Sequence, residues 1–292
     1  GSPVVYDSLN AQGNVIAYDA NAQKVVIAYY GFSSPNTGLA IVGTVSGTSV
    51  SFGTRVTMNP TGPTREIGIV YAPDQQKVVC SYRDQNNSSY GTAIAYYNSI
   101  AFDPNTAGKF VVAYRNADNS QKGTAIIGTV SGTSISFGSE YNYLTAYSNP
   151  REVIHDSVNN KNVIFYGDGS EHGKAKVATL DESNNSLTFG VEATVKAASI
   201  GSSGAGAFNA AAAKIDLIYK DEADSNKAKL VTGTVSGTTI SFTGETTIDT
   251  NQTDYFSVVY NTTLKNNFIA YADETNTQGE AFVNQLALST VG

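Results

Sequence analysis

The stretch Ile41-Val-Gly-Thr-Val-Ser-Gly-Thr-Ser-Val-Ser-Phe-Gly53 decides the fold class, because the chain repeats it almost word for word. It returns at 126–138 and at 231–243, and a degenerate copy covers 177–190. Each copy reads as a strand, a tight polar turn and a second strand, which is the pattern of a β-hairpin. The chain is therefore expected to be an all-β repeat protein.

A second phrase precedes each hairpin and sets the number of repeats. It consists of two short apolar strands joined by a polar turn, as in 100–114, and its second strand ends in tyrosine. The recurring tyrosines, called anchor tyrosines below, are Tyr29, Tyr82, Tyr114, Tyr166, Tyr219 and Tyr271. Their spacings of 53, 32, 52, 53 and 52 residues indicate six units, of which the second is short by about 20 residues.

We predict a single β-propeller domain over residues 1–292, with about six blades of four antiparallel strands and a short second blade. The predicted units cover 14–62, 63–96, 97–148, 149–203, 204–252 and 253–292. Residues 1–9 are expected to form the outer strand of the last blade and so close the ring. An open β-solenoid or a row of sandwiches is the alternative, although a solenoid needs atypical end repeats.

Composition limits the classes of partner. The net charge of −7 and the pI of about 4.8 argue against nucleic acid, whose phosphates an acidic surface repels. No apolar run reaches 18 residues, so membrane insertion is not expected. Cys80 is the sole cysteine and lies in an apolar run, which indicates a buried structural thiol and no disulfide within the chain.

The candidate binding residues come from the connections that share one face of a propeller. Arginine makes planar hydrogen bonds and aromatic rings stack on sugars, so these residues could hold a sugar or an acidic ligand. The candidates at the starts of the first strands are Arg65, Glu66, Tyr97, Arg151, Glu152 and Tyr255. Tyr30 and Phe32 join them from a loop of the first unit. The alternative is that the same side chains plug the channel or pair with one another.

The sequence shows no catalytic set, so we expect no enzyme, no cofactor and no metal site. His155 stands where other units have an aromatic residue and is expected to be packed. A glycosidase would need two carboxylates at the channel, and Glu66 and Glu152 qualify by position. Each has an arginine as its neighbour in sequence, which favours a lowered carboxyl pKa and argues against an acid catalyst. The loops at 118–120 and 224–226 offer oxygen ligands for weak calcium binding but lack the EF-hand pattern.

The repeats at 100–115 and 123–138 resemble repeats of long proteins from marine tailed phages, some of which look like tail-fibre or other virion proteins. The resemblance implies a non-enzymatic, virion-associated propeller that binds a host-surface glycan or protein, or other virion proteins. A virion or extracellular location follows from it. The alternatives are a secreted or cell-surface carbohydrate-binding lectin and, with less support, a glycan-degrading enzyme.

Overall fold

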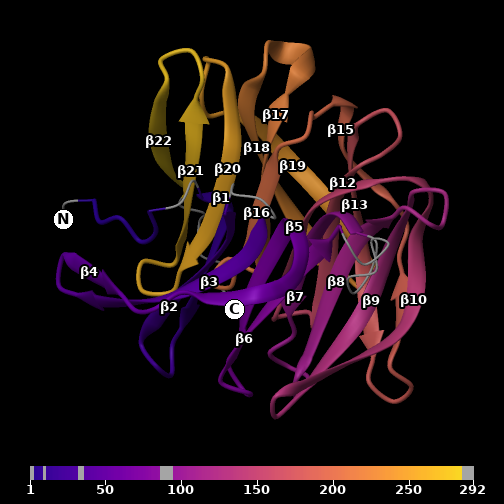
Figure 1. Ribbon diagram of the computed structural model, residues 1–292. Helices are drawn as coiled ribbons and strands as arrows, with labels where there is room; N and C mark the ends of the chain where they lie inside the picture. The colour runs from indigo at the N-terminus through magenta and orange to yellow at the C-terminus, as the bar shows by residue number, and fades with distance from the viewer. Residues whose placement is uncertain (1–2, 9–10, 32–35, 86–94, 285–292) are drawn as a thin grey trace.

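The computed structural model describes residues 3–8, 11–31, 36–85 and 95–284, and almost all of its regular structure is β-strand. Every strand pair is antiparallel, and one short 3-10 helix (Glu222–Asp224) is the exception to the all-β pattern in the described chain. Figure 1 shows the sheets following one another around the molecule from the N-terminal to the C-terminal sheet. The all-β class predicted from the repeats is confirmed.

The strands form five hydrogen-bonded sheets. The first sheet contains β1 (Ala11–Asp19), β2 (Lys24–Gly31), β3 (Thr37–Ser46), β4 (Ser49–Phe52), β5 (Val56–Ala72) and β6 (Lys77–Asp84). The second contains β7 (Ala95–Phe102), β8 (Lys109–Asn116), β9 (Lys122–Ser131) and β10 (Ser134–Tyr147). The third contains β11 (Asn149–Asp156), β12 (Lys161–Gly167), β13 (His172–Asp181), β14 (Ser186–Phe189) and β15 (Ala193–Ser199).

The fourth sheet contains β16 (Gly204–Asn209), β17 (Lys214–Asp221), β18 (Lys227–Ser236) and β19 (Thr239–Thr247). The fifth contains β20 (Thr253–Asn261), β21 (Asn266–Asp273) and β22 (Gln278–Asn284). The predicted six units become five sheets because β5 continues through the boundary between units one and two. Its first half pairs with β3 and its second half pairs with β6.

Two corrections concern the short second unit and the N-terminus. Residues 91–96 end the predicted second unit (63–96) and mostly lie outside the described residues, but Ala95 and Tyr96 pair with β8 and so belong to the next unit. Residues 3–8 form no strand, and no strand pair among the described residues joins the first sheet to the last. A ring closed by an N-terminal strand is therefore not formed by these hydrogen bonds.

The two glycines of the repeated phrase have different structural roles. The second, as in Gly132, is the first residue of a two-residue hairpin loop and has a φ of +60°, a conformation that favours glycine. The first, as in Gly128, does not have a positive φ. Instead a Cβ placed there would lie 2.0 Å from the ring of Phe110, so the missing side chain makes room for that ring. The phrase thus encodes both the turn and the packing of the hairpin.

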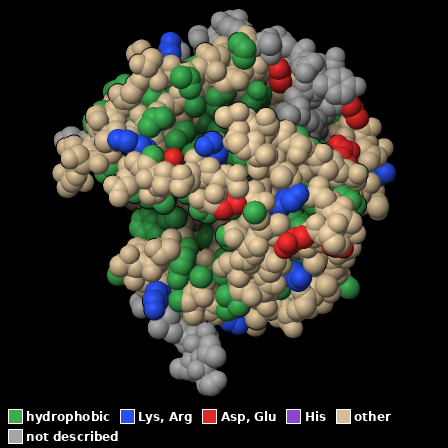
Figure 2. Space-filling model, turned by 90° about the horizontal axis from the view of Figure 1, so that it is seen from below, with side chains coloured by type: hydrophobic (Ala, Val, Ile, Leu, Met, Phe, Trp, Pro, Cys, Tyr) green, Lys and Arg blue, Asp and Glu red, His purple; other side chains and the backbone are tan. Residues whose placement is uncertain are grey.

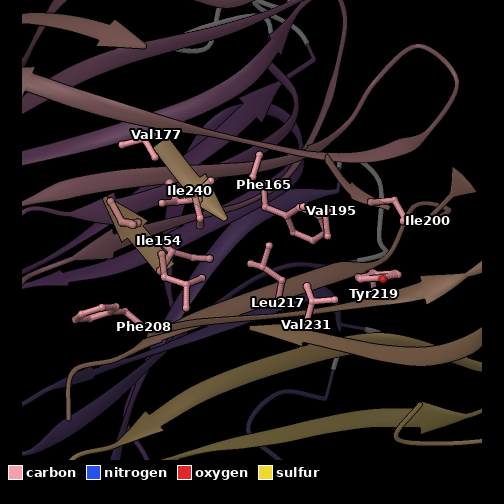
Figure 3. Close-up of a cluster of buried hydrophobic side chains, with 14 residues drawn as sticks. Ile154, Phe165, Val177, Val195, Ile200, Phe208, Leu217, Tyr219, Val231 and Ile240 are labelled. Atoms are coloured by element: carbon pink, nitrogen blue, oxygen red, sulfur yellow. The ribbon is translucent and has the colours of Figure 1, made fainter. Parts of the chain in front are cut away.

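Hydrophobic clusters join neighbouring sheets in chain order. The largest, shown in Figure 3, interleaves β11–β15 side chains such as Phe165 with β16–β19 side chains such as Leu217. Similar clusters join the first sheet to the second, the second to the third and the fourth to the fifth. The first and last sheets differ, since Ile16 is 63% exposed and Val259 is 58% exposed on them.

The anchor tyrosines tie the strands of a unit together through carboxylates. Tyr114, Tyr166 and Tyr219 are buried, and each donates a hydrogen bond of 2.5 to 2.6 Å to the glutamate 26 residues later, Glu140, Glu192 and Glu245. Burial is the largest cause that raises the pKa of each of these phenols. In the first unit the residue 26 positions after Tyr29 is Arg55 and not a glutamate. Asp7 supplies the carboxylate there and accepts hydrogen bonds from both Tyr29 and Arg55.

The N-terminal segment packs as a fourth strand does elsewhere, although it forms no strand. The ring of Tyr6 lies 5.2 Å from the ring of Tyr29 and 5.8 Å from that of Phe52. In the middle of the chain, Tyr143 from β10 lies 5.1 Å from Tyr166 and 6.2 Å from Phe189, at the same sequence offsets. The segment therefore fills the place against the first sheet that a preceding unit fills at the third.

Candidate functional site

One cavity of about 520 Å³ lies among the first strands of the units. It is lined by residues of β1, β5, β7, β11, β16 and β20, so each of the six predicted units contributes one strand to its wall. The strand pairings place six of these residues at one equivalent level, opposite the residue before each anchor tyrosine: Val15, Gly68, Ser99, Glu152, Ala205 and Ser257. Glu152 is the one charged side chain at that level. This space is called the central cavity below.

The face of the molecule in Figure 2 is hollowed, and hydrophobic side chains line the hollow while charged side chains of both signs surround it. The walls of the central cavity likewise include Ile69, Ile100 and Val258 beside the polar groups. Ligand sites in proteins typically have this composition, with apolar walls and a few polar groups that fix orientation.

A β-bulge interrupts the first strand at the same place in five of the units. The bulges contain Gly13, Glu66, Tyr97, Arg151 and Tyr255. Glu66, Tyr97 and Tyr255 have φ values of +51°, +52° and +55°, in the left-handed region that non-glycine residues seldom occupy. Such strained residues are concentrated at binding and catalytic sites, and bulges re-aim side chains there. Four of the predicted site residues therefore stand on bulged backbone.

Four of the five arginines of this acidic chain gather beside these bulges, namely Arg65, Arg83, Arg115 and Arg151, and Arg55 is the fifth. The Glu66 carboxylate lies near three of them. It lies 3.6 Å from the Arg83 guanidinium, accepts a hydrogen bond from the Tyr97 backbone and is also under the field of Arg65 and Arg115. Burial still raises the pKa of Glu66, because desolvation outweighs these positive charges. This group is called the arginine cluster below.

Aromatic rings are interleaved with the guanidinium groups. The ring of Tyr97 lies 4.9 Å from Arg115 and 5.8 Å from Arg151, and Arg115 also stacks on Tyr147 at 4.8 Å. Arg65 stacks on Tyr30 at 4.4 Å. Stacking of this kind holds a guanidinium plane in one orientation while its edge remains able to donate hydrogen bonds.

Arg151 is a buried member of the cluster, with 2% of its side chain exposed. One terminal nitrogen, Nη2, donates to the Glu171 carboxylate at 2.6 Å and to the carbonyl of Gly201. Its Nε and Nη1 atoms have no hydrogen-bond partner among the described residues. Arg151 also lines the central cavity. Arg151 thus has two donor atoms without acceptors, and both are buried inside the protein.

Glu152 faces the same cavity from the next position of β11. Its Oε1 accepts a hydrogen bond of 2.7 Å from the Ser99 hydroxyl, which in turn accepts one from the backbone N–H of Val153. Burial raises the pKa of the Glu152 carboxyl to about 7, against the smaller opposing effect of the Ser99 bond. The carboxyl is therefore poised to gain or lose a proton near neutral pH.

The prediction that the neighbouring arginines would lower these carboxyl pKa values is wrong. Arg151 turns to Glu171 while Glu152 turns to Ser99, because residue 151 lies in the bulge and the two side chains diverge. Arg65 likewise donates to the carbonyl of Thr64. The side chains of adjacent strand residues point in different directions and need not pair, and at both glutamates desolvation outweighs the effects that lower the pKa.

The other predicted site residues have mixed outcomes. Tyr30 does join the cluster through Arg65, whereas Tyr255 is 76% exposed and its neighbour Phe256 lines the cavity instead. Phe32 lies outside the described residues. Arg83 and Arg115 were not predicted as site residues, although each directly follows an anchor tyrosine and this shared offset could have singled them out.

The remaining candidates for chemistry are engaged in other contacts. Asp224 of the predicted calcium loop pairs with Lys227 at 2.7 Å and with Lys229 at 2.6 Å. His155 is buried with 7% of its side chain exposed and its pKa is lowered mainly by desolvation, as a packed residue would be. The Cys80 thiol is partly buried, and burial raises its pKa to about 11.

One group of carboxylates could approach a metal ion, formed by Asp249, Asp273 and Glu280 within 4.8 Å of one another. It lies on the last sheet and its connection, away from the cavity walls. No helix among the described residues has the length and hydropathy needed to cross a membrane.

Comparison with solved structures shows folds of the β-propeller type. An arginine-to-alanine triple variant of AofleA from Arthrobotrys oligospora aligns with a TM-score of 0.55 at 7% identity, covering 91% of this chain and 80% of that one. NanB sialidase from Streptococcus pneumoniae aligns at 0.50 with 10% identity, over 90% of this chain and 53% of the sialidase. An exo-β-1,3-galactanase from Phanerochaete chrysosporium aligns with a TM-score of 0.51 at 9% identity, covering 97% of this chain and 62% of the galactanase.

This chain spans only about half of the sialidase and under two thirds of the galactanase. No protein-family model matches the sequence, and no curated protein does. At such low identities the likeness shows the fold alone.

The prediction that the chain is not an enzyme is nevertheless contradicted by these neighbours. It rested on the absence of a familiar motif, yet a sialidase and a galactanase share this fold. In this fold a missing motif therefore does not exclude catalysis on glycans. The raised pKa of Glu152 removes the second ground for that prediction.

Proposed function

We propose that this chain is a six-bladed β-propeller that binds a glycan at the central cavity. The observation that carries the proposal is the arginine cluster with its interleaved tyrosines, which lies at the strand bulges beside a cavity of about 520 Å³. Two of its members, Glu66 and Tyr97, have left-handed backbone. Aromatic faces and fixed planar donors are the groups that bind sugar rings and their hydroxyl groups. A sialidase and a galactanase among the structural neighbours support the same class of ligand.

The six-bladed ring is part of this proposal. Six first strands line one cavity, and each contacts the next in chain order from β1 to β20. Tyr6 makes the contacts with the first sheet that Tyr143 makes with the third, which supports an N-terminal segment that completes the last blade. The virion or extracellular setting expected from the repeats, with a host-surface glycan as partner, remains a prediction that mass spectrometry of purified virions would test.

The binding proposal is tested with a glycan array and calorimetry on the purified chain. Arg115→Gln removes the guanidinium that stacks on both Tyr97 and Tyr147 and is expected to weaken binding at least tenfold. Arg55→Gln is the matched control, because Arg55 pairs with Asp7 on the first sheet and is half exposed. A chain that binds no glycan, or an Arg115→Gln variant that binds as tightly as the parent, contradicts the proposal.

Glycoside hydrolysis is a second candidate, favoured by Glu152. A carboxyl with a pKa of about 7 in a cavity can protonate the glycosidic oxygen as the bond to the leaving sugar breaks. The second carboxylate that activates water would come from Glu66 in the arginine cluster or from Glu171, the partner of Arg151. Release of reducing sugar by the parent and not by Glu152→Gln would support this reaction, and inertness on every glycan that the chain binds would refute it.

A further inference from the structure

We propose that the short second unit is a docking site for a β-hairpin of another protein, which supplies the two outer strands that this unit lacks. The site is an apolar groove of about 380 Å³ between β6 and the strands β8 to β10 of the second sheet. The groove shares no lining residue with the central cavity, so the inference is independent of glycan binding.

The groove occupies the place of the outer strands that other units have. Asp84 and Ala95 are 11 positions apart in the chain, whereas the equivalent Asn116 and Asn149 of the next unit are 33 apart. The second unit is therefore too short for a third and a fourth strand of the usual length. Among the described strands, β6 pairs with β5 alone. An edge of this kind can accept a strand of a partner through backbone hydrogen bonds.

The missing cover leaves apolar side chains of β10 exposed. Ile135 is 45% exposed, whereas its counterparts in the repeated phrase, Leu187 and Ile240, are 4% and 5% exposed. The third strand of the preceding unit covers each counterpart, since Ile127 lies in one cluster with Leu187 and Val177 in one cluster with Ile240. The groove thus exposes apolar surface that the fold buries elsewhere, and burial of that surface favours a complex.

The equivalent places in other units show which side chain fits over the anchor tyrosine. Tyr143 packs on Tyr166 and Tyr6 packs on Tyr29, with ring centres 5.1 Å and 5.2 Å apart. In the groove the anchor tyrosine is Tyr114. A hairpin that fits is therefore expected to place an aromatic or branched apolar side chain over Tyr114.

Charge specifies the next residue of the hairpin. In two other units the residue after this apolar side chain pairs with an opposite charge located 26 positions after the anchor tyrosine. Lys196 lies 3.0 Å from Glu245, and Asp7 lies 2.8 Å from Arg55. At the groove the equivalent residue is Glu140, which lines it. The hairpin is therefore expected to have lysine or arginine directly after its apolar residue.

A second copy of this chain is a poor source of such a hairpin. The third strands that cover the next unit in this way have fully buried side chains, such as Ala125 and Ile127 of β9 and Ala175 and Val177 of β13. Release of either strand would expose the core that it covers. The groove is therefore assigned to a separate protein.

The test uses a synthetic hairpin with the sequence of residues 172–199, which contains β13 to β15, closed by a disulfide at its paired ends. Calorimetry with the full chain should show binding of one hairpin. A Lys196→Glu hairpin should bind about tenfold more weakly, because its new charge repels Glu140. Ile135→Glu in the chain should weaken binding about tenfold or more, since it buries a charge. Val42→Glu, at an equally exposed residue of β3, is the matched control and should have no effect.

Weaker binding both in the Ile135→Glu chain and with the Lys196→Glu hairpin supports the inference. A chain that binds no hairpin overturns it, as does a folded Ile135→Glu variant that binds as tightly as the parent. If that variant does not fold, the Lys196→Glu hairpin decides, and equal affinity overturns the inference. Sedimentation of the chain alone tests the remaining occupant. Dimers that Ile135→Glu abolishes would place a second copy in the groove and overturn the separate partner.

Discussion

The guanidinium of Arg115 lies 4.9 Å from the centre of the Tyr97 ring, and the backbone of Tyr97 is in the left-handed region. Tyr97 is therefore a residue whose function and stability conflict, because a strained φ of +52° costs about 1–3 kcal/mol. The strained backbone places the Tyr97 ring between Arg115 and Arg151. Glycine would adopt the same backbone more easily but has no ring to place there.

The first prediction follows from that conflict. Tyr97→Gly should leave the free energy of unfolding close to its original value, because relief of backbone strain offsets the lost ring contacts. Glycan binding should fall at least tenfold. Chemical denaturation and calorimetry measure the two effects, and Tyr97→Phe, which keeps the ring, should bind nearly as the parent does. A large loss of stability in Tyr97→Gly would show that the ring has a structural role.

The second prediction concerns pH and Glu152. Its folded-state pKa of about 7 lies above the ordinary value of 4.5, so the folded chain binds more protons than the unfolded one between these values. Stability from this group is present below about pH 4.5 and is lost as pH rises through 7, by on the order of 2–3 kcal/mol. Urea denaturation from pH 5 to pH 8 should show this fall.

Glu152→Gln removes the titrating group, so its stability should exceed that of the parent at pH 8 and the fall with pH should shrink. Glu274→Gln, on an exposed loop residue, is the control and should behave as the parent does. If the parent and Glu152→Gln had parallel pH profiles, Glu152 would not be a buried carboxyl with a raised pKa.

Much of the fold could be predicted from sequence because its determinants are local. The hairpin of the repeated phrase needs one glycine at the turn and one beside a ring, and Gly132 and Gly128 satisfy both within a few residues. Closure of the proposed ring would depend on segments almost a whole chain apart. Tyr6 packs on Tyr29 without forming the predicted strand, and neither periodicity nor propensity could decide that.

The site was only partly predictable for a related reason. Arg151 and Glu152 were predicted to lie at the channel, and both line the central cavity, but Arg151 was expected to lower the pKa of Glu152. The bulge at Arg151 sends it to Glu171, which lies 20 residues away in the chain. The pKa of Glu152 depends on desolvation by surrounding strands, and no neighbour in the sequence reports it.

The third prediction tests the N-terminal segment. Tyr143 is 2% exposed between Tyr166 and Phe189, so Tyr143→Ala should cost about 3–5 kcal/mol of unfolding free energy. Tyr6 makes the equivalent contacts but is only partly buried, so Tyr6→Ala should cost about 1–2 kcal/mol. Denaturant unfolding of the two variants measures both. A Tyr6→Ala variant as stable as the parent would show that the segment takes no part in the packed fold.

The fourth prediction separates the two glycines of the repeated phrase. Gly132→Ala meets no atom within 4 Å but keeps a φ of +60°, so it should cost about 1 kcal/mol through backbone strain. Gly128→Ala has ordinary backbone but brings its Cβ to 2.0 Å from the Phe110 ring, and overpacking of this kind costs about 1–3 kcal/mol or more.

A double variant distinguishes these causes. Phe110→Leu removes the far edge of the ring, so it should restore part of the stability that Gly128→Ala loses and restore none in Gly132→Ala. The comparison uses the free energy of unfolding of the two single glycine variants with and without Phe110→Leu. Simple additivity in the Gly128→Ala pair would mean that the glycine is required for its backbone and not for the space it leaves to the ring.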